Sequence, residues 1–209
     1  MFTGIVSAIG RIVEARPLGV GPGFGRAVSV AAPAGYLDDV GVGDSIALAG
    51  ACMTVLALDA TRLRFSVEVS AESLARTAGL GAPGDVNLEK SLRAGSRLDG
   101  HLVSGHVDAV GQVSGYDRVG ESVRLEVAAP AALAPLLARK GSVAVDGVSL
   151  TVNGVVDDAG GGCRFDANLI AHTASQTTLG ALAVGRPVNL EVDPIARYVE
   201  RMLALMPRR

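Results

Sequence analysis

Two short segments of the sequence place small polar side chains at the same spacing. Cys52 and Thr54 lie in AGACMTV, and Ser149 and Thr151 occupy the same positions of DGVSLTV, each time after a glycine. Strand alternation puts both members of a pair on one face, and glycine lets a ligand or another backbone approach closely. A thiol or hydroxyl beside a threonine is typical of a ligand-binding face and could assist addition to the ligand. For Cys52 taken alone, the alternative is a small buried apolar residue.

Histidine supplies the second candidate chemistry, because its ordinary pKa lies near neutrality. His101 and His106 occur together in GHLVSGH and are either bases or hydrogen-bonded structural residues. They lie five residues apart, on opposite sides of a strand, and His172 is in a different part of the chain, which argues against a shared metal. Because Cys52 and Cys163 are the only cysteines, we expect no metal site and two thiols.

Two charged residues flank the second polar segment. Asp146 precedes its glycine, and simple alternation turns Asp146 away from Ser149. It would join the same site only through a β-bulge at Gly147 or from a neighbouring chain. Lys140 precedes the strand and is either part of the site or an ordinary surface charge.

The overall composition limits the class of protein. The chain has 209 residues, 49% hydrophobic and 19% charged, with a formal net charge of −2. Without a cluster of basic residues, this balance gives no electrostatic basis for binding nucleic acid. The apolar runs are shorter than the roughly 20 residues of a membrane-spanning helix, and the N-terminal segment lacks the pattern of a signal peptide. We therefore expect a cytoplasmic protein without membrane contact.

The segments that position these residues occur twice, at an offset of about one hundred residues. Four segments recur in the same order: TGIVSAIGRI and SGHVDAVGQV, SIALAGACMTV and SVAVDGVSLTV, RFSVEVSAESLART and RFDANLIAHTASQT, and VNLE in both halves. In this alignment His106 replaces Ile5 of the first copy. Two similar sites that differ in one proton-transfer residue could bind the same ligand and treat it differently.

Each copy reads as alternating strands separated by glycine-rich turns, which predicts two similar β-barrels. Loops are expected at residues 19–25 and 157–162. The first of these is a poor phosphate-binding loop, because a strand-like segment and not a helical one follows it. Short helices are expected around residues 33–39, 70–77, 130–139 and 171–178, with Ser70 as an N-cap.

The C-terminal segment differs from the rest of the chain. Asp193 can cap a helix, and Pro194 suits its first turn. Apolar residues then follow at helical spacing and form one stripe: Ile195, Val199, Met202, Leu203 and Met206. This stripe either packs on its own barrel or forms an oligomer contact, and the spacing leaves both alternatives open.

Several motifs of the sequence belong together: the opening MFTGIV, GHLVSGHVD, the paired AGACMTV and DGVSLTV, the KG before the second, TTLG, and the closing VNLEVDPIARYVER. With these motifs the sequence resembles, over essentially its whole length, riboflavin synthase of the alpha-chain type. This resemblance implies an all-β fold of two tandem, similar six-stranded antiparallel Greek-key β-barrels with short helices, plus a C-terminal α-helix that assembles a homotrimer. The implied domains are a lumazine-binding barrel at residues 1–100, a second at 101–193, and the trimerisation helix at 194–209.

The resemblance also implies a reaction, in which two molecules of 6,7-dimethyl-8-ribityllumazine form riboflavin and 5-amino-6-ribitylaminouracil. A four-carbon unit is transferred, without cofactor or metal, in the last step of riboflavin biosynthesis. Each barrel would hold one substrate molecule, and the first barrel of one subunit would meet the second barrel of the next. Holding both reactants face to face is a large part of such catalysis. Lumazine synthase is a further partner that the resemblance raises.

Substrate contacts are implied in both barrels. Those of the first are Phe2, Thr3, Gly4, Ile5, Val6, Cys52, Met53, Thr54, Glu68, Val69, Ser70, Ala71, Glu72 and Ser73. Those of the second are Gly105, His106, Val107, Lys140, Ser149, Leu150, Thr151, Asn168, Leu169, Ile170, Ala171, His172 and Thr173. The first barrel departs from the family pattern at Ala49, where asparagine is common.

Catalytic roles are carried over in the same way. Cys52 or Ser45 would assist addition at C7 of one lumazine, and His106, supported by Ser149 and Thr151, would assist removal of a proton from the C7 methyl group of the other. Lys140 and Asp146 complete the candidate catalytic residues. The main alternative is a non-catalytic antenna protein of the same fold that binds lumazine or flavin. A flavin-binding barrel reductase is disfavoured, because nothing in the sequence provides a nicotinamide site.

Overall fold

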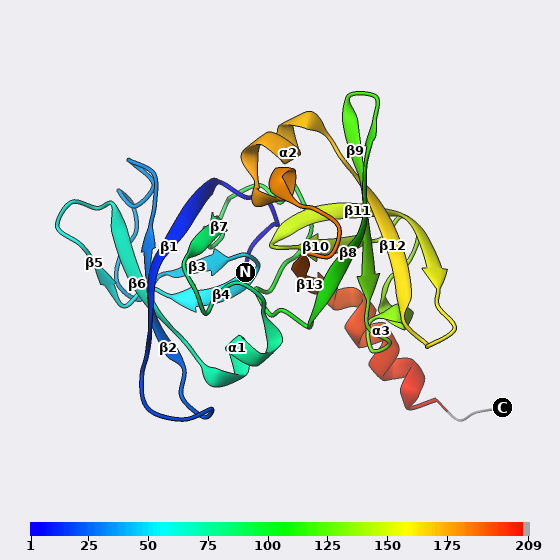
Figure 1. Cartoon of the computed structure of the whole chain (residues 1–209), viewed down its shortest axis with the longest axis horizontal. Coiled ribbons are helices and arrows are strands. Elements are labelled where there is room, and N and C mark those ends of the chain that lie inside the picture. Colours follow the sequence, from blue (N-terminus) through cyan, green and yellow to red (C-terminus); the bar gives the residue numbers. More distant parts are fainter. Residues whose placement is uncertain (207–209) are drawn as a thin grey trace.

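The computed structural model describes residues 1–206, which form two β-barrels side by side and a C-terminal helix (Figure 1). The first barrel contains β1 (Ala8–Pro17), β2 (Arg26–Ala31), β3 (Ser45–Leu48), β4 (Ala51–Thr54), β5 (Ala57–Leu58), β6 (Arg64–Val69) and β7 (Gly84–Lys90). The second contains β8 (Ala109–Val119), β9 (Ser122–Ala129), β10 (Ser142–Val145), β11 (Val148–Asp157), β12 (Cys163–Leu169) and β13 (Pro187–Val192).

Both barrels have the same antiparallel strand order. The second is closed, in the order β10-β11-β12-β9-β8-β13, and the first follows β4-β3-β7-β1-β2-β6-β5. The short strands β4 and β5 together occupy the place of the single strand β11, so the first barrel also has six strand positions, one of them interrupted. At the interruption, the Leu56 N–H still donates to the Ser66 carbonyl at 2.9 Å. The predicted pair of six-stranded antiparallel barrels is therefore confirmed.

Apolar side chains fill the interior of each barrel. Strand alternation sends one side chain in two inward, and the inward set of the first barrel includes the fully buried Val30, Leu48 and Phe65. Phe165 lies in the core of the second barrel together with the buried thiol of Cys163. Because both interiors are packed, polar residues that bind a ligand must lie on the outer faces of the strands.

Short helices cover the ends of the barrels. They are α1 (Ala71–Arg76), α2 (Ala171–Gln176) and the 3₁₀ turns η1 (Ala134–Leu136) and η2 (Thr178–Ala181). Ser70 caps α1 as predicted, accepting a 3.0 Å hydrogen bond from the Ser73 N–H. The helix expected at 33–39 is wrong: the segment forms turns, and Gly35 has a φ of +82°, which a right-handed helix does not accept. At 130–139 only η1 forms, because Pro135 cannot donate a backbone hydrogen bond.

The barrels are joined by an apolar contact and by a pair of exchanged asparagines. Phe2 is fully buried between the barrels against Val103, whose N–H donates to the Phe2 carbonyl at 3.1 Å. Asn87 of β7 donates to the Asp146 carbonyl of the second barrel at 2.9 Å. Asn189 of β13 donates to the Ala49 carbonyl of the first barrel at 3.0 Å. The asparagine of each barrel thus bonds to a hairpin turn of the other barrel. This contact explains why asparagine recurs in both copies of VNLE.

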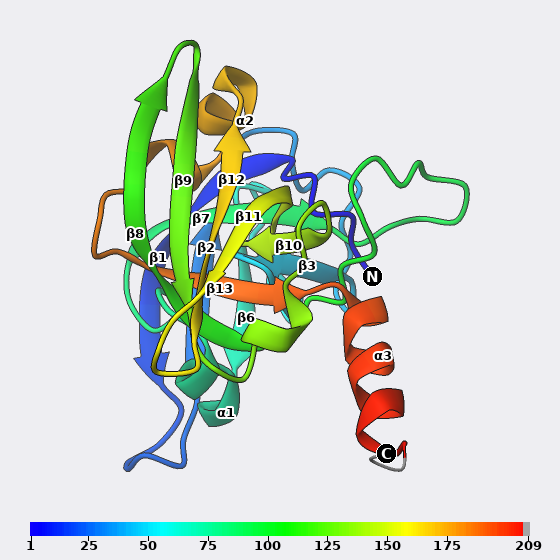
Figure 2. The same ribbon diagram turned by 90° about the vertical axis from the view of Figure 1, so that its right-hand side faces the viewer.

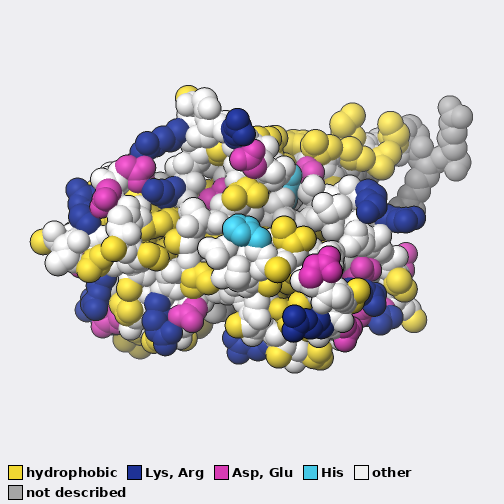
Figure 3. Space-filling view, turned by 90° about the horizontal axis from the view of Figure 1, so that it is seen from above, with side chains coloured by type: hydrophobic (Ala, Val, Ile, Leu, Met, Phe, Trp, Pro, Cys, Tyr) yellow, Lys and Arg dark blue, Asp and Glu magenta, His cyan; other side chains and the backbone are white. Residues whose placement is uncertain are grey.

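Helix α3 (Pro194–Ala204) extends away from the second barrel (Figures 1 and 2). Asp193 caps it as predicted, accepting a 2.9 Å hydrogen bond from the Ile195 N–H. None of its residues is buried. Its apolar stripe is exposed, from 48% at Val199 to 66% at Ile195, and Figure 3 shows apolar side chains gathered along the segment that leads to the grey C-terminal residues. Within residues 1–206, no helix has the length and apolar character needed to cross a membrane.

Candidate functional site

The repeated polar pairs lie on the outer faces of the barrels. In β4, Ala51 and Met53 are buried, whereas Cys52 is partly exposed and Thr54 exposed. Ser45 is directly opposite Thr54 on the neighbouring strand β3. Cross-strand partners share a face, so these three side chains form one polar surface.

The second barrel repeats this surface. Ser149 is partly exposed and Thr151 is exposed on β11, and Ser142 of β10 is directly opposite Thr151. The alternation predicted for both segments is confirmed.

Each polar face is completed by a loop from the other barrel. The Cys52 N–H donates to the Gly105 carbonyl and the Ser149 N–H donates to the Gly4 carbonyl, both at 2.8 Å. A Cβ added at Gly105 would lie 2.5 Å from Cys52 Cβ, and one added at Gly4 would lie 2.6 Å from Ser149 Cβ. Both glycines also have a positive φ, of 82° and 75°, so only glycine fits these crossings.

This exchange corrects the grouping expected from the sequence. The loop that carries Ile5 lies beside Ser149, and the loop that carries His106 lies beside Cys52. The sequence-based sets instead kept Gly4–Ile5–Val6 with Cys52 and Gly105–His106–Val107 with Ser149. Alternation within one copy cannot reveal the exchange, because it depends on how the two barrels pack. We call the two regrouped sets the Cys52 half-site and the Ser149 half-site.

Ser149 has a partner that the sequence did not assign. Its Oγ lies 2.7 Å from His101 Nδ1. His101 is 9% exposed, and burial lowers its pKa. Its other ring nitrogen, Nε2, is buried without a hydrogen-bond partner among the described residues. Within one chain Ser149 therefore pairs with His101 and not with His106, and the signal that could have found His101 was its place in GHLVSGH.

A buried glutamate holds each of the exchanged loops. Glu89 accepts hydrogen bonds from the Thr3 N–H at 2.7 Å, the Thr3 hydroxyl at 2.8 Å and the Gly4 N–H at 3.0 Å. Glu191 accepts from the backbone N–H groups of Ser104, Gly105 and His106 at 2.7, 3.1 and 3.1 Å. Burial raises the pKa of Glu89, and it raises that of Glu191 to about 7. Glu89 and Glu191 are the glutamates of the two VNLE segments. Their contacts with the exchanged loops explain why glutamate recurs in both copies.

The other candidate residues are distributed around the two half-sites. Residues 68–73 span the end of β6 and the start of α1, and 168–173 span the equivalent end of β12 and start of α2. Asn168 is exposed and accepts a 2.9 Å hydrogen bond from the Ser122 hydroxyl. Lys140 is exposed, and its Nζ lies 3.3 Å from Asn153 Oδ1. His106 is exposed. Phe2, in contrast, is fully buried and positions the loop behind it.

Asp146 lies in a different place from the one expected. It occupies a two-residue hairpin turn with Gly147, with φ values of 45° and 79°, and no bulge returns it to the face of Ser149. Its Oδ1 accepts a 2.8 Å hydrogen bond from the Asn189 N–H, and burial raises its pKa to about 7.

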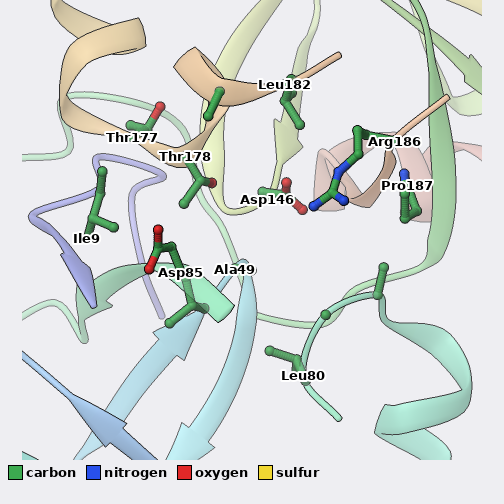
Figure 4. Close-up of a pocket in the computed structure, with 14 residues that line it drawn as sticks. Ile9, Ala49, Leu80, Asp85, Asp146, Thr177, Thr178, Leu182, Arg186 and Pro187 are labelled. Carbon is green, nitrogen blue, oxygen red and sulfur yellow. The ribbon is translucent and has the colours of Figure 1, made fainter. Parts of the chain in front are cut away.

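Asp146 lines a cavity of about 340 Å³ between the barrels (Figure 4). Arg186 points its guanidinium group toward Asp146 across this cavity (Figure 4). The lining includes none of Cys52, His106, Ser149 and Thr151. Among residues 1–206, no group of three or more His, Cys, Asp or Glu side chains is placed to hold a metal ion.

Comparisons with known proteins agree with this duplicated arrangement. The family model of the lumazine binding domain matches twice, at residues 3–91 and 104–193. Among similar proteins, the riboflavin synthase of Photobacterium phosphoreum is 42% identical over 207 residues, covering 97% of this chain and 89% of the relative. That of Mycobacterium bovis is 43% identical over 216 residues, covering 97% and 98%.

Solved structures share the fold at lower identity. A crystal structure of LumP complexed with riboflavin matches with a TM-score of 0.78 at 21% identity, covering 92% of this chain and 99% of that one. LumP complexed with 6,7-dimethyl-8-(1'-D-ribityl) lumazine matches with a TM-score of 0.76 at 20% identity, with the same coverage. From the two domain matches and the full-length relatives, the chain belongs to the riboflavin synthase family of tandem lumazine-binding domains.

Proposed function

We propose that this protein is a riboflavin synthase, a transferase that converts two molecules of 6,7-dimethyl-8-ribityllumazine into riboflavin and 5-amino-6-ribitylaminouracil. The observation that carries the proposal is the pair of exchanged half-sites, each a strand with a thiol or hydroxyl and a threonine, crossed by a glycine loop of the other barrel. A reaction between two copies of one substrate needs two similar binding sites. Its unequal outcome, one donor and one acceptor of carbon, needs the sites to differ.

The two half-sites differ in the residues that can react. The Cys52 half-site has a thiol and the exposed His106, while the Ser149 half-site has a hydroxyl bonded to His101 and the exposed Ile5. We assign assistance of addition at lumazine C7 to Cys52 or Ser45. We assign removal of a proton from the C7 methyl group of the other lumazine to His106.

Because the Cys52 N–H donates to the Gly105 carbonyl, the residues of both assignments lie in the Cys52 half-site. In the trimer this half-site would face the Ser149 half-site of a neighbouring subunit, so the two roles would act on the two different lumazines held face to face. The Ser149 half-site, with Thr151 and Lys140, then binds and orients the other lumazine. The segments 68–73 and 168–173 supply further substrate contacts in the two half-sites.

A homotrimer formed through α3 is part of the proposal. All the described residues of its stripe are more than 45% exposed, the lowest value being 48% at Val199. The stripe borders a largely apolar groove of about 540 Å³, which lies between α3 and residues 135–142. An unpaired apolar face of this kind is typical of an interface. In such an assembly the first barrel of one subunit would face the second barrel of the next, and we infer that the enzyme works in the cytoplasm on a biosynthetic intermediate.

The test is to incubate the purified protein with 6,7-dimethyl-8-ribityllumazine alone, with a chelator present, and to follow riboflavin by absorbance and chromatography. We expect one riboflavin for every two lumazines consumed. Tight binding of lumazine without riboflavin would contradict the proposal and favour a non-catalytic antenna protein. Cys52→Ala and His106→Ala should each lower turnover, and unchanged turnover would remove that residue from the mechanism.

A further inference from the structure

The side chain of Arg197, on helix α3, contacts the second barrel and the loop that carries His106. The guanidinium group of Arg197 lies 3.0 Å from Asp108 Oδ2 and donates to the His106 carbonyl at 3.2 Å. It also lies 3.9 Å from Glu191 Oε1. One residue of the protruding helix therefore contacts the segment that carries His106 and the carboxylate that holds it.

The Glu191 carboxylate needs such a partner. Its side chain is only 2% exposed, and a buried carboxylate is costly unless it is hydrogen-bonded and paired with a cation. Three backbone N–H groups of the loop supply the hydrogen bonds, and Arg197 supplies the positive charge. Arg197 is itself fixed by Asp108, whose Oδ2 also accepts a 2.9 Å hydrogen bond from the Val192 N–H.

Among residues 1–206, no equivalent link joins the Ser149 half-site to α3. Its loop is held by Glu89, which accepts the hydroxyl of Thr3 in addition to two backbone N–H groups. The positive charge that acts on the pKa of Glu89 is that of the N-terminal amino group, which lowers it against the effect of burial. The two otherwise similar half-sites therefore differ in what fixes their loops.

We propose that Arg197 is a positioning residue, through which α3 sets the loop Ser104–His106 and with it the Cys52 half-site alone. The path is short: Arg197 contacts Glu191 and the His106 carbonyl, Glu191 holds Gly105, and Gly105 lies against Cys52. In this proposal Arg197, on the inward side of α3, positions the loop of the Cys52 half-site. The apolar stripe on the outward side of α3 forms the contact between subunits. The activity measurement and the Leu203→Glu background below rest on the proposed function, whereas the thiol measurement on Arg197→Ala does not.

The reactivity of the Cys52 thiol tests this proposal directly. Cys52 is partly exposed and Cys163 is buried, so a chromogenic disulfide reagent reports on Cys52 in the native protein, with Cys163 as the unreactive reference. We expect Arg197→Ala to increase the reaction rate of Cys52 by roughly threefold or more, because the Gly105 loop no longer covers it. Arg197→Lys, which can meet one carboxylate but not the whole cluster, should give an intermediate rate.

Two controls separate positioning from general effects. Arg201→Ala removes an exposed arginine of the same helix and should leave the rate unchanged. Leu203→Glu weakens the apolar stripe but keeps Arg197, so it gives a dissociated background in which no neighbouring subunit covers Cys52, and adding Arg197→Ala to it should still raise the reaction rate. An unchanged rate in folded Arg197→Ala, or no further rise when Arg197→Ala is added to Leu203→Glu, would overturn the proposal.

Activity supplies a second readout. Loss of a charge-assisted contact should lower kcat/KM for lumazine dismutation by about tenfold in Arg197→Ala and by less than about twofold in Arg201→Ala. Arg197→Lys should recover part of the loss. If the wild-type protein forms no riboflavin, the proposed function fails, and the thiol measurement still decides whether Arg197 positions the loop.

Discussion

The backbone N–H of Cys52, in the first barrel, donates a 2.8 Å hydrogen bond to the carbonyl of Gly105, in the second. The reactive residue of one barrel is therefore fixed against the backbone of the other. Nothing larger than glycine fits at this crossing, since an added Cβ would come within 2.5 Å of Cys52 Cβ and 2.8 Å of the Phe2 ring. The geometry of the half-site depends on contact between the barrels as much as on either barrel alone.

Gly105→Ala should lower both stability and activity. Cβ overlap and the φ of +82° should together reduce the free energy of unfolding by about 3 kcal/mol. Gly185→Ala is a matched control, with a φ of +88° and nothing within 4 Å of the added Cβ, and it should cost only about 1 kcal/mol. Urea denaturation measures both. Equal losses would mean that the crossing tolerates a methyl group.

His101 and Ser149 should act as a unit. Because Ser149 Oγ lies 2.7 Å from His101 Nδ1, we expect Ser149→Ala and His101→Asn each to lower kcat/KM by about tenfold and the double variant to lose little more. Ser96→Ala, at an exposed position, is the control. If the losses in the double variant multiply, the two residues act independently and the hydrogen bond has no role in the reaction.

Ala49→Asn should stabilise the first barrel. Ala49 has a φ of +44° in a hairpin turn before Gly50, a conformation that asparagine accepts and alanine does not favour. The expected gain in the free energy of unfolding is roughly 0.5 to 1 kcal/mol, measured by thermal or urea unfolding. Ala60→Asn, in an exposed turn outside the positive-φ positions, should have no effect. A loss of stability in Ala49→Asn would show that the space beside Asn189 is too small for the amide.

Stability should fall as the pH rises from about 4 to about 7. Burial raises the pKa of Asp146 from 3.8 to about 7, so this carboxyl binds its proton more tightly in the folded chain. Its contribution is full below about pH 4 and is lost as the pH rises through about 7, with a slope of up to about 1.4 kcal/mol per pH unit.

Asp146→Asn keeps the oxygen that accepts from Asn189 and removes the titration. The variant should therefore gain stability relative to the wild-type protein between about pH 4 and 7, as followed by unfolding across that range. Glu191, whose pKa is also raised to about 7, would leave a smaller slope in the variant. Glu14→Gln, at a surface position, should run parallel to the wild type, and the prediction fails if Asp146→Asn does the same.

Much of the fold could be predicted from the sequence, because local patterns determine it. The repeat, the alternation around Cys52 and Ser149, and the caps at Ser70 and Asp193 all depend on neighbours in the chain. The helix expected at 33–39 failed where Gly35 adopts a positive φ. Propensity alone does not reveal such a choice.

The candidate site was harder to predict for a related reason. Its residues could be identified from the duplicated segments, but their grouping depends on contacts between segments about one hundred residues apart, such as that between Gly4 and Ser149. His101 was missed as a partner of Ser149 because it has no counterpart in the first copy. The position of Asp146 was predicted wrongly because strand alternation does not apply within the hairpin turn that contains it.

Because the loops are exchanged, neither barrel contains a complete half-site by itself. A single barrel separated from the other would keep the strand of its half-site but lose the glycine loop that crosses it. Two copies of the first barrel, paired by a true two-fold axis, would set Gly4 of each against Cys52 of the other and produce two identical thiol sites. Two copies of the second barrel would likewise produce two identical serine sites. Only the fusion of two diverged copies gives one molecule a site of each kind, and with it a built-in distinction between donor and acceptor.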